Sequence, residues 1–174
     1  NTKDCTHDCS SCGASCGIGP LPPGLFPQNE YVARMKELLK MRRALKLDAI
    51  MLFDELNNHY FTGLSCDSGF LSVTAEGPVF HTDPRYSVAA KRIAPWLETE
   101  SLKKRSEEST SIARLCRSAK RIGIESNLPA GKFLKLKELL SGVEFIFVDA
   151  EISRLRSIKS KAEINAIRKS AAIN

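Results

Sequence analysis

Residues 49–53 read Ala49-Ile50-Met51-Leu52-Phe53, a continuous apolar run of strand length. A run this short, with no polar face, is typical of a strand that is buried on both sides of a sheet. It follows a segment from Tyr31 to Leu45 in which apolar residues recur at helical spacing. An amphipathic helix that leads into a buried strand predicts the start of an α/β domain.

The segments after residue 53 continue the alternation of strands and helices. Phe70–Thr74 and Pro78–His81 flank Ala75-Glu76-Gly77, a pattern that predicts a β-hairpin. Asp83 stands where a helix N-cap would, with Pro84 at the first helical position. The other predicted elements are a helix from there to Arg92, an edge strand at 98–102, a helix at 107–118, a strand at 122–125, a helix at 129–140 and a strand at 143–148. We therefore expect a mixed α/β sheet flanked by helices.

The chain has 174 residues and a formal net charge of +6. This length suits one domain with a real core, plus extensions. The positive residues are spread over the predicted helices without interleaved aromatic residues, which favours solvated helix faces over a nucleic-acid surface. No apolar run approaches the roughly 20 residues that span a bilayer. The N-terminus has no basic-then-apolar signal segment, so nothing in it points to secretion.

Four cysteines lie close together near the N-terminus: Cys5, Cys9, Cys12 and Cys16, with the spacing Cys-x3-Cys-x2-Cys-x3-Cys. Four thiols at this density can surround a tetrahedral zinc ion or part of an iron–sulfur cluster. The alternatives are an unstructured tail with reduced thiols, or disulfides. If the thiols bind a metal, the site is structural or carrier-like, because protein ligands fill all four positions.

The other residues with catalytic chemistry are isolated in the sequence. Cys66 and Cys116 are interpreted as packing or surface residues rather than nucleophiles, and His59 and His81 have no second ligand at metal spacing. The sequence contains no recognisable Ser/His/Asp nucleophile arrangement, Gly-rich phosphate loop or His-Glu-x-x-His motif. It therefore predicts no catalytic residue in this chain.

The segment from Arg154 to Ala172 is interpreted as a linker that runs into a new helix. Ile164, Ile167 and Ala171 fall on one face of that helix. A short helix alone is marginal in water, so this face needs a partner. The helix either folds back on its own domain or begins a further domain of a longer protein.

Three stretches resemble the creatinase/Xaa-Pro peptidase family. Asn58-His59-Tyr60-Phe61-Thr62-Gly63 is similar to an asparagine, tyrosine-x-threonine-glycine element of the family's N-terminal domain. Thr82-Asp83-Pro84-Arg85-Tyr86, with the alanines that follow it, is similar to that domain's Asp-x-Arg-Tyr element. The segment from Arg156 to Lys169 is similar to the join between the family's two domains. The order of the three stretches and the spacing between them are also similar to those of the family.

The resemblance implies a fold and a domain organisation. The fold is a creatinase N-terminal-domain-like mixed sheet flanked by helices, with a ribonuclease H-like motif, truncated before the pita-bread catalytic domain. Residues 1–28 are expected to be a Cys-rich head and a Pro/Gly linker, and residues 29–152 the N-terminal domain. Residues 153–174 are expected to be a linker and the first helix of the catalytic domain.

The resemblance also implies site residues and cofactors. Arg85, Tyr86, Asn58 and Tyr60 are expected to bind substrate, with Arg85 orienting a substrate carboxylate or carbonyl. A helix cap alone accounts for Asp83, and a surface salt bridge is the alternative for Arg85. The family's two divalent ions, manganese, cobalt or zinc, belong to the pita-bread domain, so none of their ligands is assigned here.

We therefore expect the non-catalytic N-terminal domain of a cytoplasmic, metal-dependent Xaa-Pro aminopeptidase or dipeptidase. Its partners would be short proline-containing peptides and a second subunit in a homodimer, with neither nucleic acid nor a membrane. The domain would cap the active-site cleft. The alternative is a metal-carrier or binding module that acts through the Cys-rich head, and a stop codon directly after Asn174 would favour it.

Overall fold

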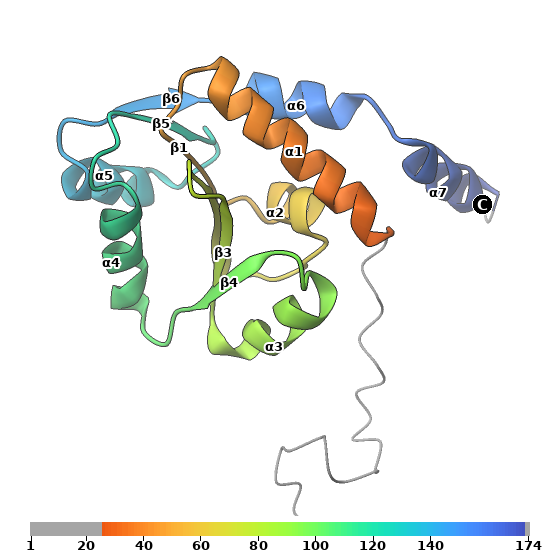
Figure 1. The fold of residues 1–174 in the computed structure, drawn as a ribbon, viewed down its shortest axis with the longest axis horizontal. Helices are drawn as coiled ribbons and strands as arrows, with labels where there is room; N and C mark the ends of the chain where they lie inside the picture. The colour runs from red at the N-terminus through yellow and green to blue at the C-terminus, as the bar shows by residue number, and fades with distance from the viewer. Residues whose placement is uncertain (1–25, 173–174) are drawn as a thin grey trace, which may run out of the picture.

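The computed structural model describes residues 26–172, which form a mixed six-stranded sheet with helices on both faces (Figure 1). The strands are β1 (Ala49–Leu52), β2 (Gly69–Val73), β3 (Pro78–Thr82), β4 (Glu98–Ser101), β5 (Arg121–Ile124) and β6 (Glu144–Phe147). The helices are α1 (Gln28–Ala44), α2 (Glu55–Thr62), α3 (Pro84–Ile93), α4 (Arg105–Leu115), α5 (Ala130–Leu139), α6 (Asp149–Ser157) and α7 (Lys161–Ala171). The predicted fold class is confirmed.

The strand order is β4-β3-β2-β1-β5-β6, so β4 and β6 form the two edges of the sheet. Strand β2 pairs antiparallel with both β1 and β3, whereas the pairs β1–β5, β5–β6 and β3–β4 are parallel. All strands except β2 therefore run in the same direction. Their carboxyl ends lie at one end of the sheet, where ligands bind in many α/β proteins.

Strand β1 supplies side chains to a core on each face of the sheet. Ile50 and Leu52 point into the core covered by α1, α2, α3 and α6, while Ala49 and Met51 point into the core covered by α4 and α5. Figure 1 shows these two helical layers on opposite sides of the sheet. A strand buried on both faces explains why the run at residues 49–53 is apolar throughout.

Side-chain caps and one glycine set the bounds of the helices near the predicted motifs. The Asp83 carboxylate accepts a hydrogen bond from the Arg85 N–H at 2.8 Å, so Asp83 caps α3 as expected. Asp54 caps α2 in the same way through the Asn57 N–H. Gly63 ends α2 with φ of 78°, and a Cβ built there would lie 2.8 Å from the Tyr31 ring. Only glycine meets both requirements at this position.

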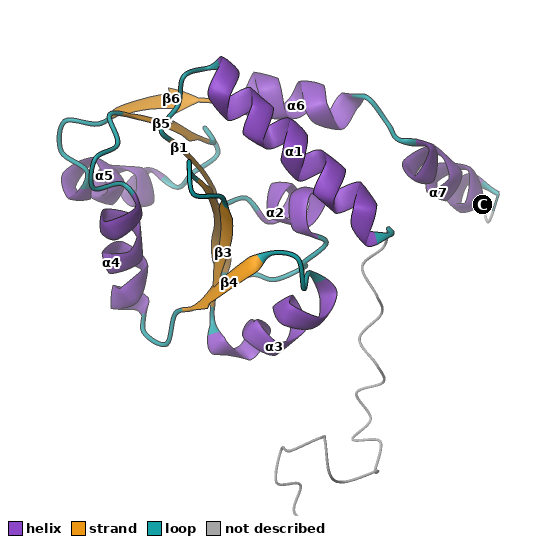
Figure 2. Cartoon of the chain, viewed as in Figure 1, coloured by secondary structure: helices purple, strands orange, loops and turns teal. Residues whose placement is uncertain are grey.

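Two helices were not predicted from the sequence. Residues 55–62 form α2, and residues 149–157, of which 153–157 were expected to be linker, form the continuous helix α6. The predicted helix at the C-terminal end is present as α7, which lies beyond the two helical layers of the sheet (Figure 2). None of its residues is buried, and the Ile167 side chain is 54% exposed.

Candidate functional site

Arg85 lies in the first turn of α3, at the carboxyl end of β3. Its Nε donates to the Asp83 carboxylate at 3.0 Å, and the side chain is 69% exposed. Among the described residues, this is the side chain's only hydrogen bond, so both terminal nitrogens of the guanidinium remain able to donate. Asp83 therefore caps the helix and holds the arginine with the same oxygen atom.

The electrostatics of this pair favour its charged form. The hydrogen bonds from the Arg85 side chain and backbone lower the pKa of Asp83, and the hydrogen bond to Asp83 raises the pKa of Arg85. Arg85 is exposed and Asp83 is partly exposed, so the pair adds little to stability. Its consequence is geometric, because it orients an exposed guanidinium.

Tyr86 follows Arg85 on α3 and connects this helix to the segment between α2 and β2. Its hydroxyl donates to Asp67 at 2.8 Å, and this hydrogen bond is the main reason that the pKa of Tyr86 is raised. The Arg85 guanidinium lies 5.5 Å from the centre of the Tyr86 ring. The two residues of the predicted Arg-Tyr element are thus fixed by separate carboxylates.

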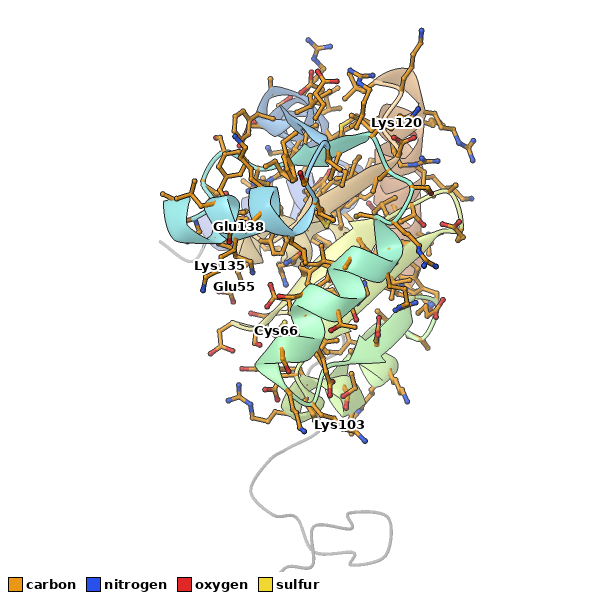
Figure 3. All side chains as sticks on the ribbon, turned by 90° about the vertical axis from the view of Figure 1, so that its left-hand side faces the viewer. Glu55, Cys66, Lys103, Lys120, Lys135 and Glu138 are labelled. Atoms are coloured by element: carbon orange, nitrogen blue, oxygen red, sulfur yellow. The ribbon has the colours of Figure 1, made fainter. Side chains whose placement is uncertain are left out.

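A cavity of about 430 Å³ opens at the carboxyl end of the sheet, and both of these carboxylates line it. Lys132 of α5 also lines the cavity. Its Nζ forms an ion pair with Glu108 at 2.8 Å and lies 4.1 Å from the centre of the Phe53 ring. Lys103 lies at this end of the molecule and Lys120 at the opposite end (Figure 3). The cavity is therefore a polar recess with charges of both signs, and Asp83, the partner of Arg85, lines it.

Tyr60 and Asn58 lie on α2, and among the described residues no hydrogen bond joins them to Arg85 or Tyr86. The Tyr60 hydroxyl donates to the Leu155 carbonyl at 3.2 Å, and the Tyr60 ring lies 4.3 Å from the Arg34 guanidinium. Asn58 is buried, and its Oδ1 has no hydrogen-bond partner among the described residues. The four predicted substrate-binding residues thus form two separate pairs.

Tyr60 belongs to a network that connects α2 with α1, α6 and α7. The buried Arg34 side chain donates to the Tyr60 carbonyl at 2.8 Å, and its Nη2 forms an ion pair with Glu163 of α7 at 3.3 Å. Glu163 also completes a capping box with Ser160 at the start of α7. The direction in which the chain leaves the domain is therefore fixed by α1 and α2.

A buried carboxylate extends this network into the sheet. Glu125 accepts hydrogen bonds from the Phe53 N–H at 2.6 Å, the Asp54 N–H at 3.0 Å and the Asn57 side chain at 2.7 Å. Asn57 in turn accepts from Arg156 at 2.8 Å. Burial raises the pKa of Glu125, and these hydrogen bonds oppose that shift. No sequence motif indicated this set, because its members are about 70 to 100 residues apart.

A second buried set, Ser72, His81 and Glu100, has the residue types of a hydrolase triad. The His81 Nε2 lies 2.8 Å from the Ser72 hydroxyl, and its Nδ1 lies 2.9 Å from Glu100 without hydrogen-bond alignment. The Ser72 hydroxyl also donates to the Val79 carbonyl at 3.3 Å. The tautomer of His81 decides which of the two atoms donates in the contact with Ser72, so the access of solvent to the set decides its interpretation. Both side chains are buried, and we interpret the set as structural.

The remaining candidates have no catalytic setting among the described residues. Burial raises the pKa of Cys66, and it raises that of Cys116 to about 11, so neither thiol is poised as a nucleophile. Within residues 26–172, no three His, Cys, Asp or Glu side chains gather closely enough to hold a metal ion. The predicted metal ligands Cys5, Cys9, Cys12 and Cys16 lie outside the described residues. Among the described helices, none has the length and apolar character needed to cross a membrane.

Known proteins are similar to this chain in sequence. The Xaa-Pro dipeptidase of Pyrococcus horikoshii is 28% identical over 141 residues, which cover 80% of this chain and 39% of that protein. An uncharacterized peptidase, YqhT, of Bacillus subtilis is 25% identical over 141 residues, covering 80% of this chain and 40% of its own length. The chain thus spans about two fifths of the length of these curated relatives.

Solved structures share the fold. The prolidase from Pyrococcus horikoshii OT3 superposes with a TM-score of 0.72 at 28% identity, covering 81% of this chain and 40% of that one. The N-terminal domain of the cytoplasmic peptidase PepQ from Mycobacterium tuberculosis H37Rv superposes with a TM-score of 0.62 at 28% identity, covering 71% of this chain and 98% of that one. A model of the creatinase/prolidase N-terminal domain family matches residues 34–158. The chain therefore belongs to the creatinase/prolidase N-terminal domain family.

Proposed function

We propose that this chain is the N-terminal, non-catalytic domain of a metal-dependent Xaa-Pro aminopeptidase or dipeptidase. It caps the active-site cleft and helps to select short proline-containing peptides. Membership of the family supports this proposal, as does the likeness to a protein named Xaa-Pro dipeptidase. The observation that carries it is Arg85, an exposed guanidinium that is held by Asp83, a residue that lines a polar recess.

Arg85 is the proposed contact to the substrate, and Tyr86 supports it. A guanidinium binds a carboxylate best through two parallel N–H groups, and the terminal nitrogens of Arg85 are able to supply them. Asp83 acts as a positioning residue because it holds Nε. Tyr86 keeps the start of α3 against Asp67.

The same proposal places Asn58 and Tyr60 in the wall of the cleft. Asn58 is buried and the Tyr60 hydroxyl is engaged by Leu155, so both would act by shaping the wall rather than by offering exposed groups. The recess that Asp83 lines and the α2 pair would then contribute separately to substrate use.

The proposed setting is a cytoplasmic homodimer with two divalent ions, manganese, cobalt or zinc, in a catalytic domain. The described residues hold no cluster that fits such a pair. We therefore assign no metal ligand and no bond-breaking step to them. Their proposed contribution is to bind and orient the peptide substrate and to exclude other peptides from the cleft.

The test compares the 174-residue chain with a longer form that includes a catalytic domain. The chain alone should not hydrolyse Xaa-Pro dipeptides or tripeptides with manganese, cobalt or zinc added. In the longer form, Arg85→Ala should lower kcat/KM roughly ten- to a hundredfold, because one charge-assisted contact is worth about 1.5–3 kcal/mol. Arg85→Lys should restore only part of this loss.

Arg92→Ala is the matched control, since Arg92 is also exposed and lies on the same helix. It should leave kcat/KM unchanged. Chelator-sensitive cleavage by the 174-residue chain alone would contradict the non-catalytic assignment. Equal kcat/KM in wild type and Arg85→Ala would remove only the role given to Arg85.

A second candidate function rests on the cysteine spacing alone. Cys5, Cys9, Cys12 and Cys16 would hold zinc or an iron–sulfur cluster and make the chain a metal carrier or binding module. Metal analysis of anaerobically purified protein, with and without Cys9→Ser and Cys12→Ser, tests this idea. Equal metal content in the two samples would eliminate it.

A further inference from the structure

Within residues 26–172, strand β6 has a strand partner on one side only, so it presents unpaired backbone groups along one edge of the sheet. The Glu144 N–H donates to the Lys120 carbonyl at 2.8 Å, and the Val148 N–H donates to the Ile124 carbonyl at 3.0 Å. In a parallel pair, alternate residues of a strand bond to the neighbour, so Glu144, Ile146 and Val148 face β5. The N–H and C=O groups of Phe145 and Phe147 therefore point away from the sheet.

The side chains beside this edge are apolar and partly exposed. Phe145 and Phe147 lie on the α5 face, where the Phe133 ring is 5.7 Å and 6.0 Å from them between ring centres. Phe147 is 54% exposed and Leu134 of α5 is 63% exposed. Lys132 bonds to α4, and Leu134 lies about 200° further around the helix, so Leu134 is on the side of α5 away from α4. The residue before it, Phe133, packs on Phe145 and Phe147 of β6.

The opposite edge of the sheet is built differently. Strand β4 reads Glu98-Thr99-Glu100-Ser101 and has no apolar side chain. Natural proteins discourage pairing at a free edge with charges of this kind. Strand β6 has one charged residue, Glu144, and Arg121 of the same chain pairs with it at 3.1 Å. Only the β6 edge therefore lacks this protection.

We propose that a second copy of this chain pairs with the β6 edge, antiparallel, with a two-fold axis at Ile146. In this register, Phe145 of each copy lies opposite Phe147 of the other. Each such pair exchanges both of its outward N–H···O=C hydrogen bonds, so every outward group of these residues is satisfied. The aromatic side chains then meet across the strands on one face, and the two Ile146 side chains meet on the other.

The helices next to the edge fit the same axis. Helix α5 packs on β6 through Phe133, so its copy in the partner would lie beside it across the axis, and packed helices are about 8–10 Å apart. Leu134 is at the middle of α5 and would meet its own copy at the axis. Three residues away on either side, Lys137 would lie opposite Gly131 rather than opposite a second lysine. The edge is thus self-complementary in backbone groups, apolar contact and charge.

This inference assigns a surface to the subunit contacts of the proposed function and rests on it only for those contacts. Association is measured without substrate, so dimerisation and peptide hydrolysis can fail separately. One four-residue edge and one helix make an interface at the small end of the usual range, so we expect a reversible dimer rather than an obligate one.

Analytical ultracentrifugation of the 174-residue chain tests the proposal. The wild type should form a dimer at tens of micromolar protein. Leu134→Lys should raise the dimer dissociation constant at least about tenfold, because it sets two positive charges against each other. Val88→Lys is the matched control: Val88 is 76% exposed on α3, and its substitution should leave the constant unchanged.

A proline pair tests the register. Phe147→Pro removes an outward N–H from β6 and should weaken the dimer, whereas Thr99→Pro makes the same change at the β4 edge and should not. Circular dichroism checks that each variant is folded. If a proline variant unfolds, the result for Leu134→Lys alone decides whether the β6 edge forms the dimer. A wild type that stays monomeric at 200 µM, on the order of ten times the expected range, would overturn the proposal. Equal weakening by Val88→Lys would overturn it as well.

Hydrogen–deuterium exchange locates the contact. The amides of Phe145 and Phe147 should exchange more slowly as protein concentration rises, because only the dimer bonds them. The amides of Thr99 and Ser101 at the β4 edge should not change. A dimer that leaves Phe145 and Phe147 unprotected would place the interface elsewhere and refute the β6 assignment.

Discussion

Arg34 on α1 and Arg85 on α3 differ in burial and in the kinds of partner that surround them. Arg34 is buried, donates to the Tyr60 carbonyl, pairs with Glu163 and contacts aromatic rings. Arg85 is exposed, and its only ion-pair partner among the described residues is Asp83, two positions away. The groups around Arg34 enclose its guanidinium, and its Nη2 meets Glu163 as an ion pair without an aligned hydrogen bond, whereas the Arg85 side chain is exposed. A buried, enclosed arginine is structural, and an oriented but exposed one is available to a ligand.

The largest expected effect lies in the buried network, at Glu125. Replacing Glu125 with Ala leaves the N–H groups of Phe53 and Asp54 and the Asn57 amide without their acceptor. We expect a loss of about 4 kcal/mol in the free energy of unfolding, since each buried unsatisfied donor costs about 1–3 kcal/mol. Urea denaturation measures this loss. Glu144→Ala is the control, because Glu144 is exposed and should cost under about 0.5 kcal/mol.

Arg34→Ala should come next. It removes the hydrogen bond to Tyr60 and leaves Glu163 without its partner, at an expected cost of about 3 kcal/mol. Lys36→Ala on the exposed side of α1 should be close to neutral. The two variants are compared by urea denaturation. Similar unfolding free energies for both would show that the Arg34 network carries no stability.

The stability of the domain should fall as pH is lowered from about 6.5 to about 4. Burial lowers the pKa of His81 to about 4, below its ordinary value of 6.5. Between these values the unfolded chain binds a proton that the folded chain does not, so the contribution is complete above pH 6.5 and lost toward pH 4. We expect a change on the order of 2 kcal/mol.

The measurement is urea denaturation at several pH values, for wild type and His81→Phe. The variant should be less stable at pH 7, because it loses the contact with Ser72. Between pH 6.5 and 4, the unfolding free energy of the variant should change less with pH than that of wild type. The buried Glu125 contributes with the opposite sign, since its pKa is raised, but it is present in both proteins and cancels in the difference. An equal pH dependence of the unfolding free energy in the two proteins would exclude His81 as the cause of the stability loss at low pH.

Arg85→Ala should have the smallest effect on stability. The side chain is exposed and its pair with Asp83 is a surface contact, so the unfolding free energy should change by less than about 0.5 kcal/mol. Thermal melts of this variant and wild type should nearly coincide. A large loss of stability would place Arg85 in the structural class with Arg34 and weaken its proposed role in binding.

The strands and the cap of α3 could be predicted because their signals are local. The apolar run at 49–53, the turn at 75–77 and the Asp83-Pro84 start each lie within a few residues. Helix α2 could not be predicted in this way, since its sequence Glu55–Thr62 has no apolar repeat and contains two asparagines. Its helical form depends on the Asp54 cap, on Gly63 and on contacts with α1.

The site residues show the same limit. Arg85 could be singled out because its motif is contiguous and the neighbouring Asp83 explains its orientation. The partners of Glu125 and His81 could not, because they come from separate strands and helices that only the folded sheet brings together. The separation of the α2 pair from the α3 pair also depends on the tertiary arrangement.

Strand β1 has a consequence for how the domain opens. It supplies Ile50 and Leu52 to one core and Ala49 and Met51 to the other, so neither helical layer can detach without exposing one face of the same strand. The two layers should therefore not behave as independent foldons. Their core amides should exchange with solvent at a common, global free energy of opening, with those of β1 among the slowest.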